Sequence, residues 1–336
     1  MNNSDRSNMS KLITGRRALL ALAMAAASVV AVTPAAGAAP GRLPEVISAS
    51  APQLHPEGVA WDPLRRSFLV SSMRYGTVSV VRPDGAVRTL AADPRMVSTF
   101  GVHTDPARGR VLTTYGDFGV GVRSTPETVR KSSGLGIFDL RTGRLRHLVD
   151  LAIGAGDHAA NDLAIDSAGN AYVTDPFSDA IYRVDVHGRA SVLIRDPRLL
   201  SNGIGMNGIV WHPSGHLLAV NYATGALWRI PVAHPERLAQ VSLSEPLVGG
   251  DGLDLRPDGS LTVVTNKLSA PGRVAVRALR SADGWHSARV THRAEPWADT
   301  EPTTVARTPH GSYVLDGRLS ALLAGRPVHT FTLRRV

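Results

Sequence analysis

The sequence contains no cysteine, and only 5% of its 336 residues are aromatic. The absence of cysteine excludes a disulfide scaffold, a thiolate nucleophile and thiolate-ligated zinc or iron–sulfur centres. Any metal must therefore be held by oxygen atoms or imidazole rings. After the first 39 residues the chain also lacks a sustained apolar period of 3.6 residues, which argues against an α/β fold. With 43% hydrophobic residues, the composition is that of an ordinary globular protein.

Basic residues are in excess, but they are not concentrated. The chain has 37 Lys and Arg against 28 Asp and Glu, a formal net charge of +9. The arginines occur singly or in pairs, such as Arg65-Arg66 and Arg334-Arg335, and no interleaved aromatics accompany them. This distribution indicates a solvated surface rather than a basic stripe, so we expect no nucleic-acid partner.

Residues 1–38 have the order of an export signal. Basic residues, including Arg16 and Arg17, precede an apolar run over residues 18–32, and small residues follow it. This order is typical of a secretory signal peptide, and we expect cleavage near Ala38. The apolar run is shorter than the roughly 20 residues of a membrane span, so we expect a secreted mature protein without an integral membrane segment. Arg16-Arg17 also resembles a twin-arginine signal.

A short apolar motif recurs six times. The copies begin at intervals of 43, 61, 46, 44 and 52 residues. A second apolar run follows each copy, often across a turn such as Pro-Asp-Gly, which is typical of a strand, a turn and a second strand. The six copies are Glu57–Pro63, Phe100–Pro106, Asn161–Ser167, Asn207–Pro213, Asp251–Pro257 and Thr303–Pro309.

Further apolar runs follow in most copies, such as Thr77–Val81 and Val87–Leu90 in the first. Four short strands in a repeat of about 45 residues are typical of a propeller blade. We therefore predict an all-β fold, a six-bladed β-propeller with four-stranded antiparallel blades, as a single domain over residues 45–336. The last copy lacks a fourth strand after Thr330–Leu333, so we expect Glu45–Ala49 to complete that blade and close the ring.

The first residues of the six copies are expected to form a ring around the central channel, because the first strand of each blade lines it. Four of them have a carboxylate or amide side chain, two of each kind. Burying such groups together is costly unless they are satisfied, and one bound dication would satisfy all four. These four are Glu57, Asn161, Asn207 and Asp251, and Phe100 and Thr303 complete the ring.

Calcium is the ion that this donor set favours. Calcium accepts carboxylate, amide and water oxygens in flexible geometry, whereas magnesium prefers a strict octahedron and zinc prefers nitrogen or sulfur. We therefore expect Ca²⁺ or another hard divalent cation. A second interpretation stays open, because Asn, Asp and Glu before glycine often bend turns and a polar ring can hold channel waters.

The residues that open four of the copies resemble the SMP-30, gluconolactonase and regucalcin family, which is related to the calcium-dependent paraoxonases. The resemblance rests on Glu57-Gly58, Asn161-Asp162, Asn207-Gly208 and Asp251-Gly252. It covers nearly all of the mature chain and implies a six-bladed propeller that hydrolyses lactones or related esters with one catalytic divalent ion. The metal ligands that it implies are Glu57, Asn161, Asn207 and Asp251.

Such a mechanism needs a general base, because a water must lose a proton as it attacks the ester carbon. The family resemblance suggests Asp251. His158 and His55 lie shortly before ring residues, on loops expected at the same channel mouth, and an unperturbed imidazole pKa near 6.5 suits the role. Each histidine also fits a loop-bracing role, so the sequence leaves the choice among Asp251, His158 and His55 open.

The loops between the second and third strands of the blades are expected to surround the channel mouth. The longest, Asp117–Ser133, accounts for the interval of 61 residues. Loops of this length are commonly lids or binding loops, and a disordered insertion is the alternative.

Taken together, these patterns predict an exported, calcium-dependent hydrolase that acts, as a monomer, on a small-molecule lactone or ester. Two alternatives stay open: a propeller that only binds a ligand or protein and keeps a structural calcium, and a strictosidine-synthase-like condensing or cyclising enzyme. The acidic ligand set argues against the second. Other motifs carry no weight: Gly203–Gly208 matches a dinucleotide fingerprint in letters only, because a strand and not a helix is expected after it.

Overall fold

The structure is a computed structural model, and it describes residues 42–295 and 300–336. The chain from Leu43 to Val336 forms one compact unit. The export signal expected over residues 1–38 lies outside the described residues. Within the described ranges, no helix is long and apolar enough to cross a membrane.

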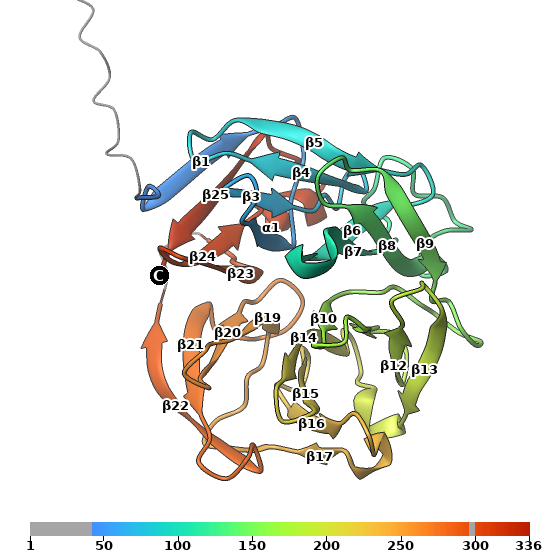
Figure 1. The fold of residues 1–336 in the computed structure, drawn as a ribbon, viewed down its shortest axis with the longest axis vertical. Helices are drawn as coiled ribbons and strands as arrows, with labels where there is room; N and C mark the ends of the chain where they lie inside the picture. The colour runs from blue at the N-terminus through green and yellow to red at the C-terminus, as the bar shows by residue number, and fades with distance from the viewer. Residues whose placement is uncertain (1–41, 296–299) are drawn as a thin grey trace, which may run out of the picture. The chain divides into compact units, whose positions relative to one another are not determined.

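Six antiparallel sheets surround a central axis, so the predicted all-β six-bladed propeller is confirmed (Figure 1). Blades 1 to 3 consist of β2 (Val59–Asp62), β3 (Ser67–Val70), β4 (Thr77–Val81) and β5 (Val87–Ala92); β6 (Ser98–Asp105), β7 (Arg110–Gly116), β8 (Ser133–Asp139) and β9 (Leu145–Asp150); and β10 (Leu163–Ile165), β11 (Ala171–Thr174), β12 (Ala180–Val184) and β13 (Ala190–Arg195). Blades 4 to 6 consist of β14 (Met206–His212), β15 (His216–Asn221), β16 (Leu227–Pro231) and β17 (Ala239–Gln240); β19 (Gly250–Leu255), β20 (Leu261–Thr265), β21 (Ala275–Arg280) and β22 (Ser287–Ala294); and β23 (Thr304–Thr308), β24 (Gly311–Asp316), β25 (Thr330–Arg335) and β1 (Val46–Ser50). Four short helices lie in the connections: η1 (Pro106–Arg108), η2 (Pro197–Leu199), η3 (Pro235–Arg237) and α1 (Leu319–Leu323).

The strands are separated by turns of the predicted chemistry. Between β19 and β20, Gly259 has a φ of +78°, a conformation that a side chain disfavours. The carboxylate of Asp258 accepts a hydrogen bond of 3.0 Å from the backbone N–H of Ser260. The Pro-Asp-Gly sequence therefore reverses the chain through the positive φ of its glycine and the hydrogen bond of its aspartate.

Strand β1 closes the ring, as predicted. It pairs antiparallel with β25, so Ile47 lies opposite Leu333 and Ser50 lies opposite Thr330. In Figure 1 the blue β1 runs beside the red β25. This pairing covers the outer edge of β25, which would otherwise be open to another strand.

Blade 5 departs from the four-stranded pattern. A short strand, β18 (Ser242–Leu243), pairs parallel with β22 and gives this sheet five strands. The segment leaves β17 of blade 4 and continues along the edge of blade 5, where the backbone N–H of Ser242 donates to the carbonyl of His286 (2.9 Å). The connection thus joins the outer edges of two neighbouring blades.

Apolar clusters lie between neighbouring blades and hold the ring together. Between blades 6 and 1, the rings of Phe68 and Tyr313 lie 5.0 Å apart, and Phe331 and Ile47 belong to the same cluster. Burial of each side chain of this size stabilises the folded state by about 1.5–3 kcal/mol relative to exposure. The packing of these apolar faces fixes the positions of the inner strands around the axis.

Ring closure can be tested at Ile47, which is 1% exposed. We expect Ile47→Ala to lower the free energy of unfolding by about 2–4 kcal/mol, because it opens a cavity in the cluster between the first and last blades. The neighbouring Val46→Ala, at a side chain that is 38% exposed, should cost less than about 1 kcal/mol. Urea denaturation measures both, and equal midpoints for the two variants would contradict this account of closure.

Candidate active site

The inner strands approach one another so closely at the axis that glycine is needed after most ring residues. An added Cβ on Gly208 would lie 1.9 Å from the carbonyl oxygen of Asp251, and one on Gly58 would lie 2.1 Å from that of Phe100. Strands β6, β14 and β19 also change register across their ring residue and the glycine after it. These irregularities turn the ring residues out of the regular pleat.

Hydroxyl groups fix the backbone of the ring residues. Thr303 Oγ1 donates to the carbonyl of Glu57 (2.6 Å), and Thr174 Oγ1 donates to that of Asn207 (2.6 Å). Ser71 Oγ accepts a hydrogen bond from the backbone N–H of Glu57 (3.2 Å). Thr303, a ring residue without an expected ligand role, therefore binds the neighbouring blade.

The four side chains predicted as metal ligands line one cavity. Glu57, Asn161, Asn207 and Asp251 come from four different blades and meet in a space of about 90 Å³. Phe100 from the second blade lines the same space. The ring expected from the repeat thus brings its two carboxylates and two amides together.

The side chains of these four residues are buried and incompletely satisfied. Within the described part of the chain, neither Asn161 Oδ1 nor Asn207 Oδ1 has a hydrogen-bond partner. Burial raises the pKa of Glu57 well above its usual range, and the nearby carboxylates of Asp251 and Asp162 raise it further. Burial also raises the pKa of Asp251, against the opposing effect of the Asn266 amide. Without a cation, this arrangement is electrostatically unfavourable.

A hard divalent cation fits this donor set. Two carboxylates would balance its charge, and the two unpartnered amide oxygens would complete the coordination with water. The described residues contain no group of three His, Asp or Glu side chains arranged to hold a metal, so a cation at the axis would also need the amide oxygens of Asn161 and Asn207. Zinc, which prefers nitrogen or sulfur ligands, suits the set poorly.

A second layer of hydrogen bonds holds Asp251. Asn266 Nδ2 donates to Asp251 Oδ2 (2.7 Å) and to the carbonyl of Pro302 (3.0 Å). The hydroxyl of Tyr222 donates to Asn266 Oδ1 (2.5 Å) and accepts from the backbone N–H of Ser269 (3.0 Å). Because each group in this series has its partner, Oδ2 of Asp251 is fixed at the edge of the cavity that this residue lines.

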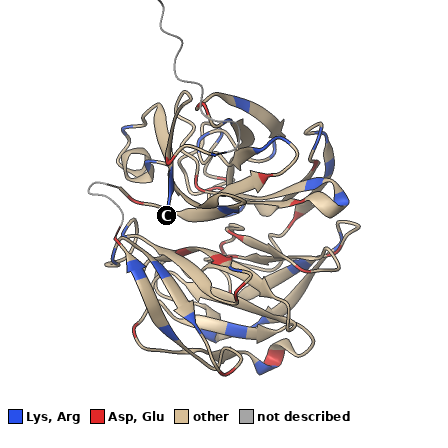
Figure 2. Ribbon diagram, turned by 60° about the vertical axis from the view of Figure 1, so that its left-hand side comes forward, with Lys and Arg blue, Asp and Glu red and all other residues tan. Residues whose placement is uncertain are grey.

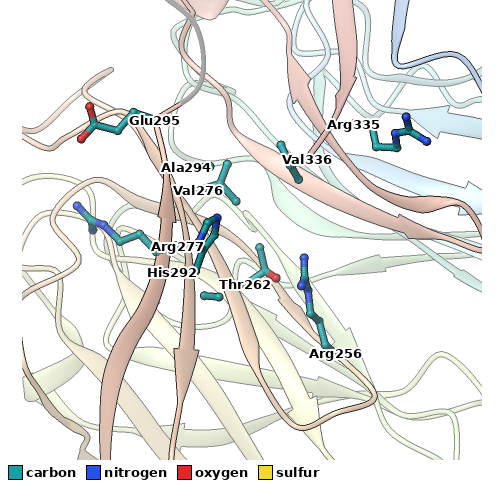
Figure 3. Close-up of a pocket in the computed structure, with 10 residues that line it drawn as sticks. Arg256, Thr262, Val276, Arg277, His292, Ala294, Glu295, Arg335 and Val336 are labelled. Carbon is teal, nitrogen blue, oxygen red and sulfur yellow. The ribbon is translucent and has the colours of Figure 1, made fainter.

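A larger cavity, of about 310 Å³, contains none of the ring side chains. Figure 3 shows Arg256, His292 and Arg335 around it, with Thr262 near its centre. It lacks the convergence of buried carboxylate and amide oxygens. The smaller cavity at the axis is therefore the candidate active site.

Residues 55–270, more than half of the chain, match the SMP-30/gluconolactonase/LRE-like region. The chain belongs to this family. Among the curated proteins, none matches it.

Three solved structures illustrate the shared fold. The major allergen Mala s 1 of Malassezia sympodialis is 17% identical, with a TM-score of 0.68 over 87% of this chain and 96% of that one. A gluconolactonase from Xanthomonas campestris is 17% identical, with a TM-score of 0.57 over 88% and 91% of the two chains. Virginiamycin B lyase from Staphylococcus aureus is 12% identical, with a TM-score of 0.54 over 87% and 99%. At such identities the likeness shows the fold alone.

His55, one of the bases considered for this family member, braces a connection instead of lining the cavity. Its Nδ1 lies 3.0 Å from the carbonyl of Gly317, and its Nε2 accepts a hydrogen bond of 3.0 Å from the N–H of Val328. Burial is the main cause that lowers the pKa of His55. Since both ring nitrogens are engaged by the connection that carries α1, the geometry does not favour His55 as the base.

His158 is also outside the cavity lining. Its Nδ1 lies 3.1 Å from Asp175 Oδ2 and 3.3 Å from the hydroxyl of Tyr182. The carboxylate of Asp175 raises the pKa of His158. Its backbone N–H donates to the carbonyl of Arg130 (2.8 Å), so His158 supports the long loop of blade 2. Of the three candidate bases, Asp251 alone lines the cavity.

The long loop between β7 and β8 is folded around one carboxylate. Asp117 accepts hydrogen bonds from Gly119 N (2.7 Å), Ser124 Oγ (2.6 Å) and Thr128 Oγ1 (2.7 Å). The alternative of a disordered insertion is therefore wrong. The loop places Phe118 in the wall of the cavity.

Helix α1 was not predicted from the sequence. This helix lies in the connection between β24 and β25, and its Leu319 and Leu323 line the cavity. The run Leu319–Leu323, apolar except for one serine and without the alternation of a strand, was the available signal. Met73, Ile204 and Leu268 complete the apolar wall from other loops, and no periodic pattern marks them.

Calcium binding tests the assignment of the cavity. We expect calcium to raise the melting temperature of the protein stripped with a chelator, and Asp251→Asn to weaken calcium binding at least about 10-fold. Asp254→Asn is the matched control, because Asp254 lies on the same strand β19 but not in the cavity. Isothermal titration calorimetry measures both variants, and equal weakening by the two would contradict the assignment.

The raised pKa values predict a pH dependence for the metal-free protein. The folded state retains protons on Glu57 and Asp251 that the unfolded chain has already lost, so stability falls as pH rises from about 4 through the raised pKa values. In the presence of a chelator, the free energy of unfolding of Asp251→Asn should therefore exceed that of the wild type by about 1–3 kcal/mol at pH 8 and equal it near pH 4. Urea denaturation would refute this if the difference were the same at both pH values.

Proposed function

We propose that this protein is a metal-dependent hydrolase that opens a lactone or cleaves a related ester. The observation that carries the proposal is the meeting of two buried carboxylates and two unpartnered amide oxygens in one cavity at the axis. Membership of the SMP-30/gluconolactonase/LRE-like family supports the reaction class. The apolar wall around the cavity is suited to a small organic substrate.

Glu57, Asn161, Asn207 and Asp251 would hold the cation, and calcium is the ion we propose. When bound, a divalent cation polarises a carbonyl oxygen and stabilises the negative charge that develops on it. A cation held between Glu57 and Asp251 would offset the repulsion between their carboxylates.

Asp251 is the general base in this proposal. Its carboxylate lines the cavity, while Asn266 holds its Oδ2 and fixes the orientation of the group. A water loses a proton to Asp251 as its oxygen forms a bond to the carbonyl carbon. The ester C–O bond then breaks, and the leaving alkoxide accepts that proton from Asp251. The products of lactone opening are one hydroxy acid and no second fragment.

The rest of the chain agrees with a small-molecule partner. Lys and Arg are spread over several blades (Figure 2), which favours a solvated surface over a nucleic-acid interface. We further propose that the protein is exported, on the basic, apolar and small-residue order of residues 1–38, and that it acts as a monomer.

Metal removal tests the reaction. The rate at which chelator-stripped protein hydrolyses a panel of lactones and aryl esters should be at least about 100-fold lower than that of the loaded protein, and added calcium should restore it. Glu57→Gln and Asn161→Ala should stay below wild type by a similar factor even with calcium, whereas Asp254→Asn should remain within about 3-fold of it.

Two results would reject the proposed reaction. Equal turnover by stripped and loaded wild-type protein would exclude the metal-dependent mechanism. No turnover of any lactone or ester by the loaded protein, with calcium binding intact, would favour the alternative of a binding propeller with a structural calcium.

A further inference from the structure

The mouth of the candidate active site contains an apolar cluster that is separate from the clusters between blades. Its buried members are Met73, Phe100, Leu319 and Leu322, with Phe118, Val120 and Leu268 packed against them. We call these seven residues the mouth cluster. The clusters between blades hold the sheets together, whereas the mouth cluster borders the cavity that contains Glu57 and Asp251.

Several unrelated loops contribute to this wall. Met73 comes from the β3–β4 loop, Phe118 from the β7–β8 loop, Leu268 from the β20–β21 loop and Leu319 from α1. The ring of Phe118 lies 5.0 Å from that of Phe100 and 5.2 Å from that of Phe177, so the aromatic surface continues outward from the axis. Apolar residues on four independent connections form one continuous wall.

The polar groups of the wall are few, and the main one is already occupied. The hydroxyl of Tyr222 is held between Asn266 Oδ1 and the backbone N–H of Ser269. Apart from the four proposed ligands and Tyr222, Ser269 is the only described lining residue with a polar side chain. A substrate with several hydroxyl groups would bury most of them against carbon, at a cost for each unpaired group.

The wall also lacks positive charge. Among the described residues that line the cavity, none is Lys or Arg, and the two charged side chains are the carboxylates of Glu57 and Asp251. An anionic group inside the cavity would therefore contact no cationic side chain; the guanidinium of Arg130 lies further out, 4.6 Å from the centre of the Phe177 ring. The site suits a neutral molecule.

The geometry also indicates where a substituent would lie. The space of about 90 Å³ is small beside the roughly 300–1,000 Å³ of a typical ligand pocket, so it suits the reacting ring or ester group alone. Leu323 of α1 lines the same cavity and is 49% exposed, so it marks the way out to solvent. A longer substituent would pass those members of the mouth cluster that line the cavity and cover Leu323.

We infer that the substrate is a neutral lactone or ester with an apolar alkyl or aryl substituent, and not a polyhydroxylated sugar lactone. This inference rests on the proposed hydrolytic function and adds the class of substrate. The reacting carbonyl lies among the four ring oxygens, and the substituent lies along the mouth cluster toward Leu323.

The test compares δ-lactones that share a six-membered ring and differ in their substituents. With calcium-loaded wild-type protein, kcat/KM should rise about 3- to 4-fold for each methylene added to a 6-alkyl chain. It should exceed that for a polyhydroxylated δ-lactone at least about 100-fold. Equal or better turnover of the polyhydroxylated lactone would overturn the inference while leaving the hydrolytic proposal intact.

Leu323→Gln identifies the surface that gives this preference. The exposed position tolerates a polar side chain, so the variant should fold, and the ratio of long-chain to unsubstituted turnover should fall about 5- to 10-fold. Leu64→Gln, at a leucine that is 63% exposed and outside the cavity lining, is the matched control and should keep the wild-type ratio. An unchanged ratio in Leu323→Gln would contradict the predicted path of the substituent.

Lactams of the same ring size separate failure of this inference from failure of the proposed reaction. They resist hydrolysis, so their binding by calorimetry does not depend on catalysis. If no ester turns over but lactam affinity rises with alkyl length, the apolar class is supported and the hydrolytic function fails. If alkyl and polyhydroxylated lactams bind equally, or neither binds, the inference is wrong.

Discussion

Two carboxylates and two amide oxygens, buried together at the axis, are the constraint on which the rest of the site depends. Such groups repel or remain unsatisfied unless a cation joins them. The surrounding chain keeps these groups together. Glycines after the ring residues allow the inner strands to approach closely, threonine hydroxyls bind the carbonyls of ring residues, and Asn266 restrains Asp251. The backbone and side chains are thus restrained so that the two carboxylates stay close together, as expected of a preorganised cation site.

The division of labour between sheets and loops explains how one fold provides both rigidity and selectivity. Apolar clusters between blades fix the inner strand ends, and those ends carry the ligand set. The loops at the mouth carry no part of the ligand set and form the apolar wall. Their side chains can therefore change without disturbing the four ring side chains.

The repeat made the fold predictable, because six copies of one strand pattern specify six equivalent positions. The grouping of Glu57 and Asp251 in one cavity followed from that register alone. The true places of His55 and His158 did not, because their partners Gly317 and Asp175 are contributed by other segments whose approach no local pattern reveals. Helix α1 and strand β18 were missed for the same reason, because each is a single departure from the repeat and has no second copy to compare. The loops that form the wall, such as Asp117–Ser133, were expected at the channel mouth, but the apolar side chains that they bring together were not.

The pairing of β1 with β25 has a consequence for biosynthesis. These strands lie about 280 residues apart in the sequence, so the final sheet cannot form until the last strand has left the ribosome. Until then the nascent chain carries two unpaired strand edges, which are sites for association with other chains. The last blade is therefore completed only after the strands of the other five blades have been synthesised.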